Sequence, residues 1–199
     1  MKFIPRSETT RQFIIENCAA LFNTKGYAAT SVTDLEKATN LTKGSIYGNF
    51  ENKDAVAVAV FDYNRENKMA LIEARVEKET TFKNKVLAHI LAHYPSTKTS
   101  FTPGGCPFQN TAIEAANNND ILRKRAGDAL LAWTADIATL IEQGILDKEF
   151  KNTTNASAIA FQIISLIEGA ALFAHATRDM KQAEGILDTA CSIVNEIST

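Results

Sequence analysis

Glycine and proline are scarce in this chain, with nine glycines and four prolines among 199 residues. Sandwiches and barrels built from many short strands need turn residues about every ten positions, so this scarcity argues against them. The chain is 45% hydrophobic and has eleven phenylalanines, which is enough to bury a sizeable core. These features exclude a disordered chain and favour an all-α fold.

Cysteine is also rare, and Cys18, Cys106 and Cys191 lie far apart in the sequence. Their odd number and the lack of a Cys-x-x-Cys spacing argue against a disulfide framework and a zinc knuckle. His89 and His93 are four residues apart without a third ligand, so we expect two ordinary histidines on one helix face and no metal site. Because no cofactor-binding fingerprint, phosphate loop or Gly-x-Ser-x-Gly motif occurs, we expect neither a cofactor nor catalysis.

Uninterrupted apolar runs are short, and none reaches the roughly 18 residues that a membrane span needs. The first eight residues, MKFIPRSE, become polar before the apolar core of a signal peptide can form. We therefore expect a cytoplasmic protein that has no membrane partner.

A global excess of positive charge is absent, since the formal net charge is −2. This excludes a polybasic protein that coats nucleic acid. The charge is nevertheless unevenly distributed, because residues 1–53 carry seven Lys and Arg against five Asp and Glu. The sequence thus divides into a first domain, 1–53, with a net charge of +2 and a second domain, 54–199, with a net charge of −4.

The first predicted helix begins near residue 8. Its apolar residues Ile14, Cys18, Leu21 and Phe22 fall on one stripe of an amphipathic helix. We expect this helix to end at Gly26, since glycine is the residue that most often follows the last turn of a helix.

Two short helices follow and meet at a tight turn. Ser31 and Asp34 have the spacing of a capping box, which predicts the start of the second helix. The helix is expected to run to Thr39, because Asn40 suits a left-handed turn and Thr42 can cap a new helix. Two short helices at such a turn, packed on a preceding helix, are typical of a helix-turn-helix.

The segment 43–50 contains two glycines and would be a poor helix in isolation. Its inward face consists of Ile46 and Phe50, joined by Leu41, and we expect these residues to pack in the core. For any single polar residue on the other face a solvated surface is the simpler interpretation, but their concentration on one short helix favours contact with DNA. The outward residues are Thr42, Lys43, Gly44, Ser45, Tyr47 and Asn49.

The remaining chain is predicted to be helical with one clear break. Residues 55–60 alternate with period two, which by itself indicates a strand, but no turn residue separates them from the helical spacing that follows. We therefore expect one long helix over about 52–79 and a loop over 95–107. Further helices are expected at 81–94, 108–118, 120–147, 154–177 and 179–197, which makes about nine in all.

The residues from Thr42 to Asp54, TKGSIYGNFENKD, resemble the amino-terminal DNA-binding domain of the TetR family of transcriptional repressors. The preceding segments 22–27 and 30–35 match the same pattern. The resemblance implies that Lys43 and Gly44 lie at base edges, whereas Gly48-Asn49 departs from many relatives, so base preference cannot be transferred. The DNA-binding residues implied by the resemblance are Thr30, Thr33, Thr42, Lys43, Gly44, Ser45, Tyr47, Asn49 and Lys53.

The same resemblance implies that the second domain binds an effector and dimerises. The helices at about 154–177 and 179–197 would form the interface of a homodimer bound to an inverted-repeat operator in double-stranded DNA. Apolar and small residues cover several faces of the helix at 154–177, so it must be buried on more than one side. The alternative to burial in a dimer interface is burial wholly within one subunit.

The effector is expected to be a small molecule of unknown identity, and repression would end when it binds or when a thiol is modified. Cys106 precedes Pro107 at a predicted helix start, where a thiolate would be stabilised; a small buried residue beside a pocket is the alternative. For the aromatic candidates, ordinary core packing is the alternative. The candidate pocket residues are Phe101, Cys106, Phe108, Gln109, Trp133 and Phe161.

Overall fold

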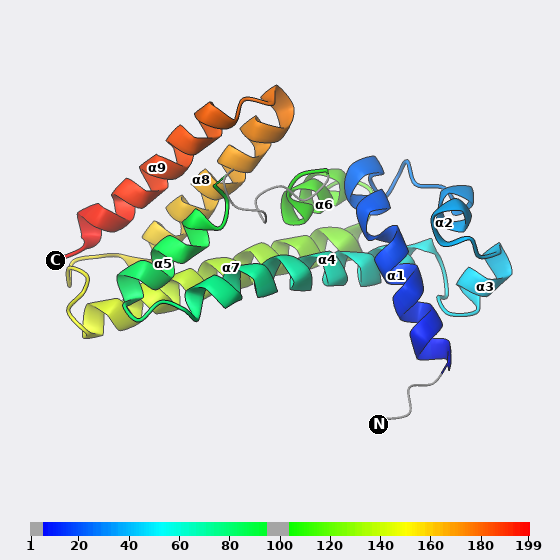
Figure 1. Ribbon diagram of the computed structural model, residues 1–199, viewed down its shortest axis with the longest axis horizontal. Coiled ribbons are helices and arrows are strands. Elements are labelled where there is room, and N and C mark those ends of the chain that lie inside the picture. The colour runs from blue at the N-terminus through cyan, green and yellow to red at the C-terminus, as the bar shows by residue number, and fades with distance from the viewer. Residues whose placement is uncertain (1–5, 95–103) are drawn as a thin grey trace. The chain divides into compact units, whose positions relative to one another are not determined.

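The structure is a computed structural model that describes residues 6–94 and 104–199. Within these two stretches the regular elements are helices joined by turns and loops (Figure 1). One isolated bridge pairs Phe150 with Ser198. The expected all-α fold of about nine helices is confirmed. The helices described are α1 (Arg6–Lys25), α2 (Val32–Thr39), α3 (Lys43–Tyr47), α4 (Lys53–Val76), α5 (Phe82–Leu91), α6 (Pro107–Ala115), α7 (Asp120–Leu146), α8 (Ala156–Thr177) and α9 (Met180–Ile197).

The chain forms two compact units. The amino-terminal unit comprises residues 1–67 and 107–127, and the carboxy-terminal unit comprises residues 68–106 and 128–199. Helix α6 packs against α1 and belongs to the amino-terminal unit. The expected functional boundary after residue 53 stays a prediction.

The turns of the amino-terminal unit follow the chemistry expected of them. Gly26 ends α1 with φ +82°, a left-handed conformation that side chains disfavour. Ser31 and Asp34 form the predicted capping box at the start of α2. Asn40, with φ 54°, ends α2, and the hydroxyl of Thr42 caps α3. The predicted helix-turn-helix boundaries are thus confirmed.

Helix α3 is held by tertiary packing. Its residue Ile46 is fully buried in a cluster with Ile14 and Cys18 of α1, Leu35 of α2 and the following Phe50. A five-residue helix with a glycine has little stability of its own, so burial of this side chain determines its orientation.

The alternating segment at the start of α4 is helical, as predicted. Val56 and Val60 are four residues apart and both are buried against α1, whereas Ala55 and Ala59 are only partly buried. The apolar residues that alternate in the sequence therefore lie on more than one face of a single helix.

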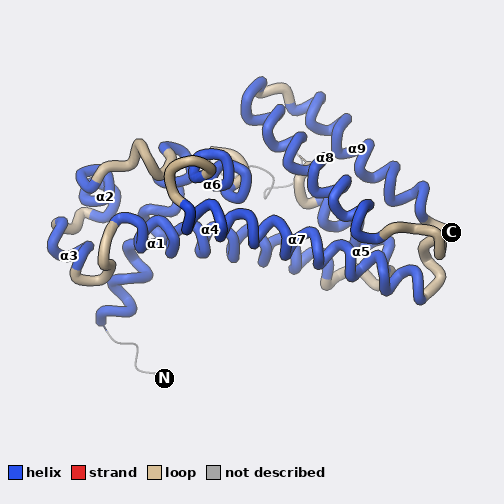
Figure 2. Tube along the Cα trace, turned by 180° about the vertical axis from the view of Figure 1, so that it is seen from behind, coloured by secondary structure: helices blue, strands red, loops and turns tan. Residues whose placement is uncertain are grey.

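In the carboxy-terminal unit, α8 and α9 pack along each other and α5 packs against α9 (Figure 2). By length and composition alone, α7 and α8 are apolar enough to cross a membrane, although core helices of water-soluble proteins pass the same test. Buried residues on α8 include Ile163 and Ile167, and their counterparts on α9 include Leu187 and Val194. Both helices therefore contribute apolar side chains to the core of this unit.

Candidate DNA interface and effector site

The outward face of α3 is polar and exposed. Thr42, Lys43, Gly44 and Ser45 are all exposed, while Ile46 directly after them is buried. A Cβ atom added to Gly44 would meet only the hydroxyl of Thr42, at 3.9 Å, so the backbone here is open to approach. The buried side chain thus holds a short polar surface toward solvent, as the sequence predicts.

Neighbouring groups hold this surface in place. The backbone N–H of Lys43 donates to a carboxylate oxygen of Glu36 on α2 at 2.7 Å, which joins the two short helices. The side-chain amide of Asn49 donates to the carbonyl of Ser45 at 2.9 Å. Tyr47 is half-buried against the core of the unit. Tyr47 and Asn49 are therefore less exposed than the residues at the start of α3.

Thr30 and Lys53, two of the DNA-binding residues implied by the resemblance, make hydrogen bonds within the protein, and their contact with DNA stays a prediction. Thr30 is only 1% exposed, and its hydroxyl donates to the carbonyl of Gly26 at 2.5 Å. The Lys53 ammonium donates to the carbonyls of Tyr27 at 2.9 Å and Thr30 at 3.0 Å, and it lies over the Tyr27 ring. Both side chains support the turn between α1 and α2, whereas the implied residue Thr33 is exposed.

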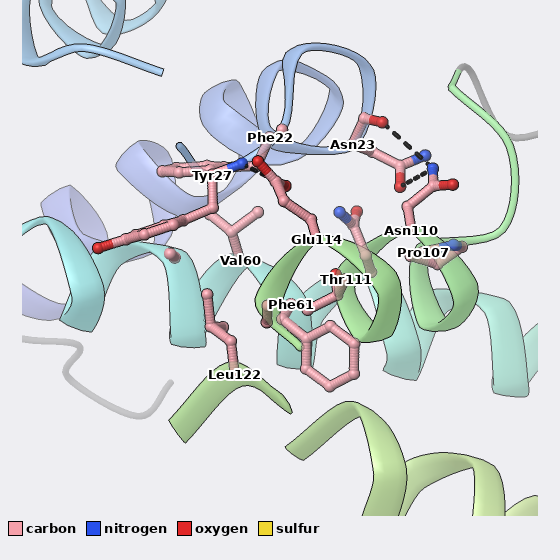
Figure 3. A pocket seen from close by; sticks show the side chains of 14 residues that line it. Phe22, Asn23, Tyr27, Val60, Phe61, Pro107, Asn110, Thr111, Glu114 and Leu122 are labelled. Carbon is pink, nitrogen blue, oxygen red and sulfur yellow. Dashed lines mark hydrogen bonds between the residues drawn. The ribbon is translucent and has the colours of Figure 1, made fainter. Parts of the chain in front are cut away.

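A small cleft, partly open to solvent, lies in the amino-terminal unit between α1, α4 and α6 (Figure 3). Its polar lining is engaged within the protein: the side-chain amide of Asn110 donates to Asn23, and Glu114 accepts hydrogen bonds from the turn after α1. None of the predicted effector-pocket residues lines this cleft.

The six predicted pocket residues do not all belong to one unit, and their shared role in a pocket stays a prediction. Phe108 is buried in the amino-terminal unit, where its ring centroid lies 6.2 Å from that of Phe61, and Gln109 beside it is half-buried. Phe161 is 50% exposed on α8 in the isolated chain. Phe101 lies outside the described residues.

The other two candidates, Cys106 and Trp133, belong to a buried polar cluster of the carboxy-terminal unit. The Lys68 ammonium donates to the Cys106 sulfur at 3.4 Å and lies 5.5 Å from the centre of the Trp133 ring. The Cys106 thiol donates to a carboxylate oxygen of Glu168 at 3.1 Å. We call this set the Lys68 cluster; its members are Lys68, His89, His93, Cys106, Trp133 and Glu168.

The two histidines of the Lys68 cluster are buried, which the prediction of two ordinary histidines on a helix face did not anticipate. The indole N–H of Trp133 donates to Nδ1 of His89 at 3.0 Å, so the His89 proton lies on Nε2. Nδ1 of His93 is 2.9 Å from the His89 carbonyl. Burial lowers the pKa of His89 to about 4, and burial, helped by the Lys68 charge, lowers the pKa of His93 well below its ordinary value. Both rings are therefore neutral at neutral pH.

Sequence reasoning missed Lys68 and Glu168 as members of this cluster. Glu168 is the only acidic residue in the otherwise apolar α8, and a lone carboxylate in such a helix signals a buried polar partner. No comparable signal marks Lys68. In residues 6–94 and 104–199 no three His, Cys, Asp or Glu side chains group as metal ligands.

Helix α8 also carries an apolar face that is open in the isolated chain. Phe161, Leu172 and Phe173 are 50%, 47% and 48% exposed. Gly169 on α8 and Gly185 on α9 have open space where a Cβ atom would stand. Large exposed apolar side chains around small residues are typical of a protein interaction surface.

The amino-terminal unit contains a helix-turn-helix whose second short helix, α3, is polar and exposed. The carboxy-terminal unit is helical and contains the buried Lys68 cluster. This combination is typical of a DNA-binding transcriptional regulator. The family model described as bacterial regulatory proteins, tetR family, matches residues 14–60. The model described as tetracyclin repressor-like, C-terminal domain, matches residues 83–190. The chain belongs to the TetR family, as the sequence resemblance indicates, and its relatives are transcriptional regulators rather than enzymes.

Solved structures and curated relatives agree with this assignment. A TetR family regulator from Cytophaga hutchinsonii is 44% identical, with a TM-score of 0.95 over 100% of this chain and 99% of that one. A TetR regulator from Chloroflexus aurantiacus is 30% identical, with a TM-score of 0.88 over 98% of each chain. The transcriptional repressor DhaR of a Mycobacterium species is 23% identical over 81% of this chain and 80% of its own length.

Proposed function

We propose that this protein is a cytoplasmic, homodimeric repressor that binds an inverted-repeat operator in double-stranded DNA and is released by a small molecule or by thiol modification. The observation that carries the proposal is the exposed polar surface of α3, held outward by the buried Ile46. A relative described as a repressor supports the sign of regulation.

In this proposal α3 enters the major groove. Lys43 and Gly44 contact base edges, because they are exposed at the first turn of the helix. Phosphate contacts come from the hydroxyl, phenol and amide groups around them. Those residues are Thr33, Thr42, Ser45, Tyr47 and Asn49.

Selection of bound fragments from random duplex DNA tests the proposal, and two variants separate the roles of the contacts. Tyr47→Ala should weaken binding to all sequences by about 1–2 kcal/mol, as loss of a phosphate contact does. Lys43→Ala should change which sequences are preferred. An unchanged preference profile for Lys43→Ala would remove this residue from base reading.

Dimerisation raises the affinity for DNA, because two helix-turn-helix domains then bind the same operator. One small domain with few phosphate contacts binds DNA weakly, whereas two heads on an inverted repeat reach roughly nanomolar affinity. We assign the interface to α8 and α9, since Phe161, Leu172 and Phe173 leave an apolar face uncovered. In sedimentation at micromolar concentration the protein should be a dimer and Phe173→Glu should dissociate it; a monomeric wild-type protein would contradict this assignment.

The Lys68 cluster is the proposed place where the effector signal enters. The Cys106 thiol contacts a cation and a carboxylate, and α6 begins at the next residue. N-ethylmaleimide should release wild-type protein from DNA in a gel shift, and Cys106→Ser should abolish this release. Cys191→Ser serves as the control, because that half-buried thiol lies outside the cluster. A normal response of Cys106→Ser would leave a non-covalent ligand as the effector.

A further inference from the structure

The turn between α1 and α2, residues 26–30, is held from two sides within the amino-terminal unit. From α4, Lys53 donates to two carbonyls of the turn and Asp54 accepts a hydrogen bond from the Tyr27 phenol. Burial, together with the Asp54 contact, raises the pKa of that phenol, so it stays protonated. From α6, the Glu114 carboxylate binds the other side of the turn.

The Glu114 contact is specific in its geometry. One carboxylate oxygen accepts a hydrogen bond from the backbone N–H of Tyr27 at 2.7 Å (Figure 3). The other accepts one from the backbone N–H of Ala28 at 2.9 Å. A Cβ atom on Gly26 would lie 2.6 Å from one of these oxygens, so only glycine lets the carboxylate approach this closely. Hydrogen bonds from N–H groups to a carboxylate are about twice as strong as neutral ones.

A second contact comes from the same face of α6. Asn110 is one helical turn before Glu114, and its side-chain amide donates to the Asn23 side chain of α1 at 3.3 Å. Residues four apart share one face of a helix, so the same face of α6 contacts both the end of α1 and the turn after it.

The position of this turn bears on DNA reading, because the turn leads into α2 and α2 carries α3. The capping box at Ser31 follows directly on the turn, and Glu36 ties α2 to the first residue of α3. A shift of residues 26–30 would therefore act first on the start of α2, and through Glu36 on the start of α3. In the sequence, α6 begins directly after Cys106.

We propose that Glu114 is a positioning residue for DNA reading: its carboxylate holds the α1–α2 turn so that α3 stands in the orientation that binds the operator. Loss of the contact loosens the turn and lowers operator affinity without removing a group that touches DNA. The role in DNA reading rests on the proposed function, whereas the contact itself can be tested without DNA.

Hydrogen exchange of the full-length protein tests the contact. The Tyr27 and Ala28 amides should exchange at least about tenfold faster in Glu114→Ala than in the wild type, because the carboxylate is their acceptor. Glu114→Gln, which keeps a single carbonyl oxygen, should give an intermediate rate. Thr111→Ala, which alters the same cleft on the same helix, is the matched control and should leave both amides protected. Equal exchange in wild type and Glu114→Ala would overturn the proposal.

Binding to the selected operator tests the role. Glu114→Ala should bind about tenfold more weakly than the wild type, Glu114→Gln less so, and Thr111→Ala should bind normally. Gly26→Ala should also weaken binding, because its methyl group displaces the carboxylate, and its effect should be smaller in the Glu114→Ala background.

Failure of the Glu114 inference and failure of the proposed function give different results in these experiments. Wild-type binding that Glu114→Ala leaves unchanged would overturn this inference and leave the proposed function intact. A wild-type protein that binds no duplex would overturn the proposed function together with the reading role of Glu114.

Discussion

Acid should unfold the carboxy-terminal unit through His89. This ring is buried, accepts a hydrogen bond from Trp133 and has its pKa lowered to about 4. Protonation would place a positive charge on Nδ1, which could then no longer accept that bond. The unfolded chain, by contrast, binds the proton at the ordinary histidine pKa of 6.5.

Proton linkage gives the direction in which the free energy of unfolding changes with pH. Between about pH 6.5 and pH 4 the unfolded state carries a proton on His89 that the folded state lacks, so stability falls as the pH falls through this window. Each pH unit corresponds to about 1.4 kcal/mol, and at pH 5 the loss amounts to about 2 kcal/mol relative to pH 7. His93 contributes in the same direction, because burial and the Lys68 charge lower its pKa as well.

Trp133 is the only tryptophan in the chain and contacts His89 directly, so its fluorescence reports unfolding of this unit. Urea titrations at fixed protein concentration should give a lower midpoint at pH 5 than at pH 7. His89→Gln keeps an acceptor for the indole and removes the titrating ring, so its midpoint should fall less. His175→Gln, at an exposed position of α8, is the control. A wild-type midpoint that is equal at both pH values, or an undiminished fall in His89→Gln, would refute the reasoning.

Other predictions concern stability. Gly144→Ala should lower stability by about 1–3 kcal/mol in thermal denaturation, because its methyl group would lie 3.0 Å from the Phe82 Cβ atom and closer still to the Phe150 ring. Gly127→Ala, with open space at that position, should stabilise α7 by about 0.5–1 kcal/mol, and a cost equal to that of Gly144→Ala would contradict the steric argument. Ser31→Ala should cost about 1 kcal/mol, because it removes the cap of α2. Contacts with Lys25 and Ser31 hold the pKa of Asp34 below its usual value, so their contribution should persist above about pH 4 and vanish in stronger acid, as melting curves would show.

Local sequence chemistry predicted most of the helix-turn-helix, because its boundaries depend on neighbouring residues. Gly26 ends α1, Ser31 caps α2 and Thr42 caps α3 as expected. The recognition surface followed from the same pattern, since the buried Ile46 leaves the polar residues of α3 outside. Caps and amphipathic faces act within a few residues, so one sequence is enough to infer them.

The roles of Thr30 and Lys53 were not evident from sequence. Both suit phosphate contact by residue type, but their polar groups bind backbone atoms of the α1–α2 turn. A side chain's partner depends on which segments the fold brings near, and that information is absent from local spacing. The predicted effector pocket stays a prediction, because Phe108 belongs to one unit and Phe161 to the other.

The sequence by itself determined the helical class, the helix-turn-helix and the family. Periodicity, helix caps and the motif around Lys43 are properties of short segments. The tertiary structure alone decided which distant side chains meet: Lys68 and Cys106 with Glu168, Trp133 with His89, and Glu114 with the turn after α1. These contacts join residues 38 to 87 positions apart, and their energy depends on burial and distance, which only the packed chain establishes.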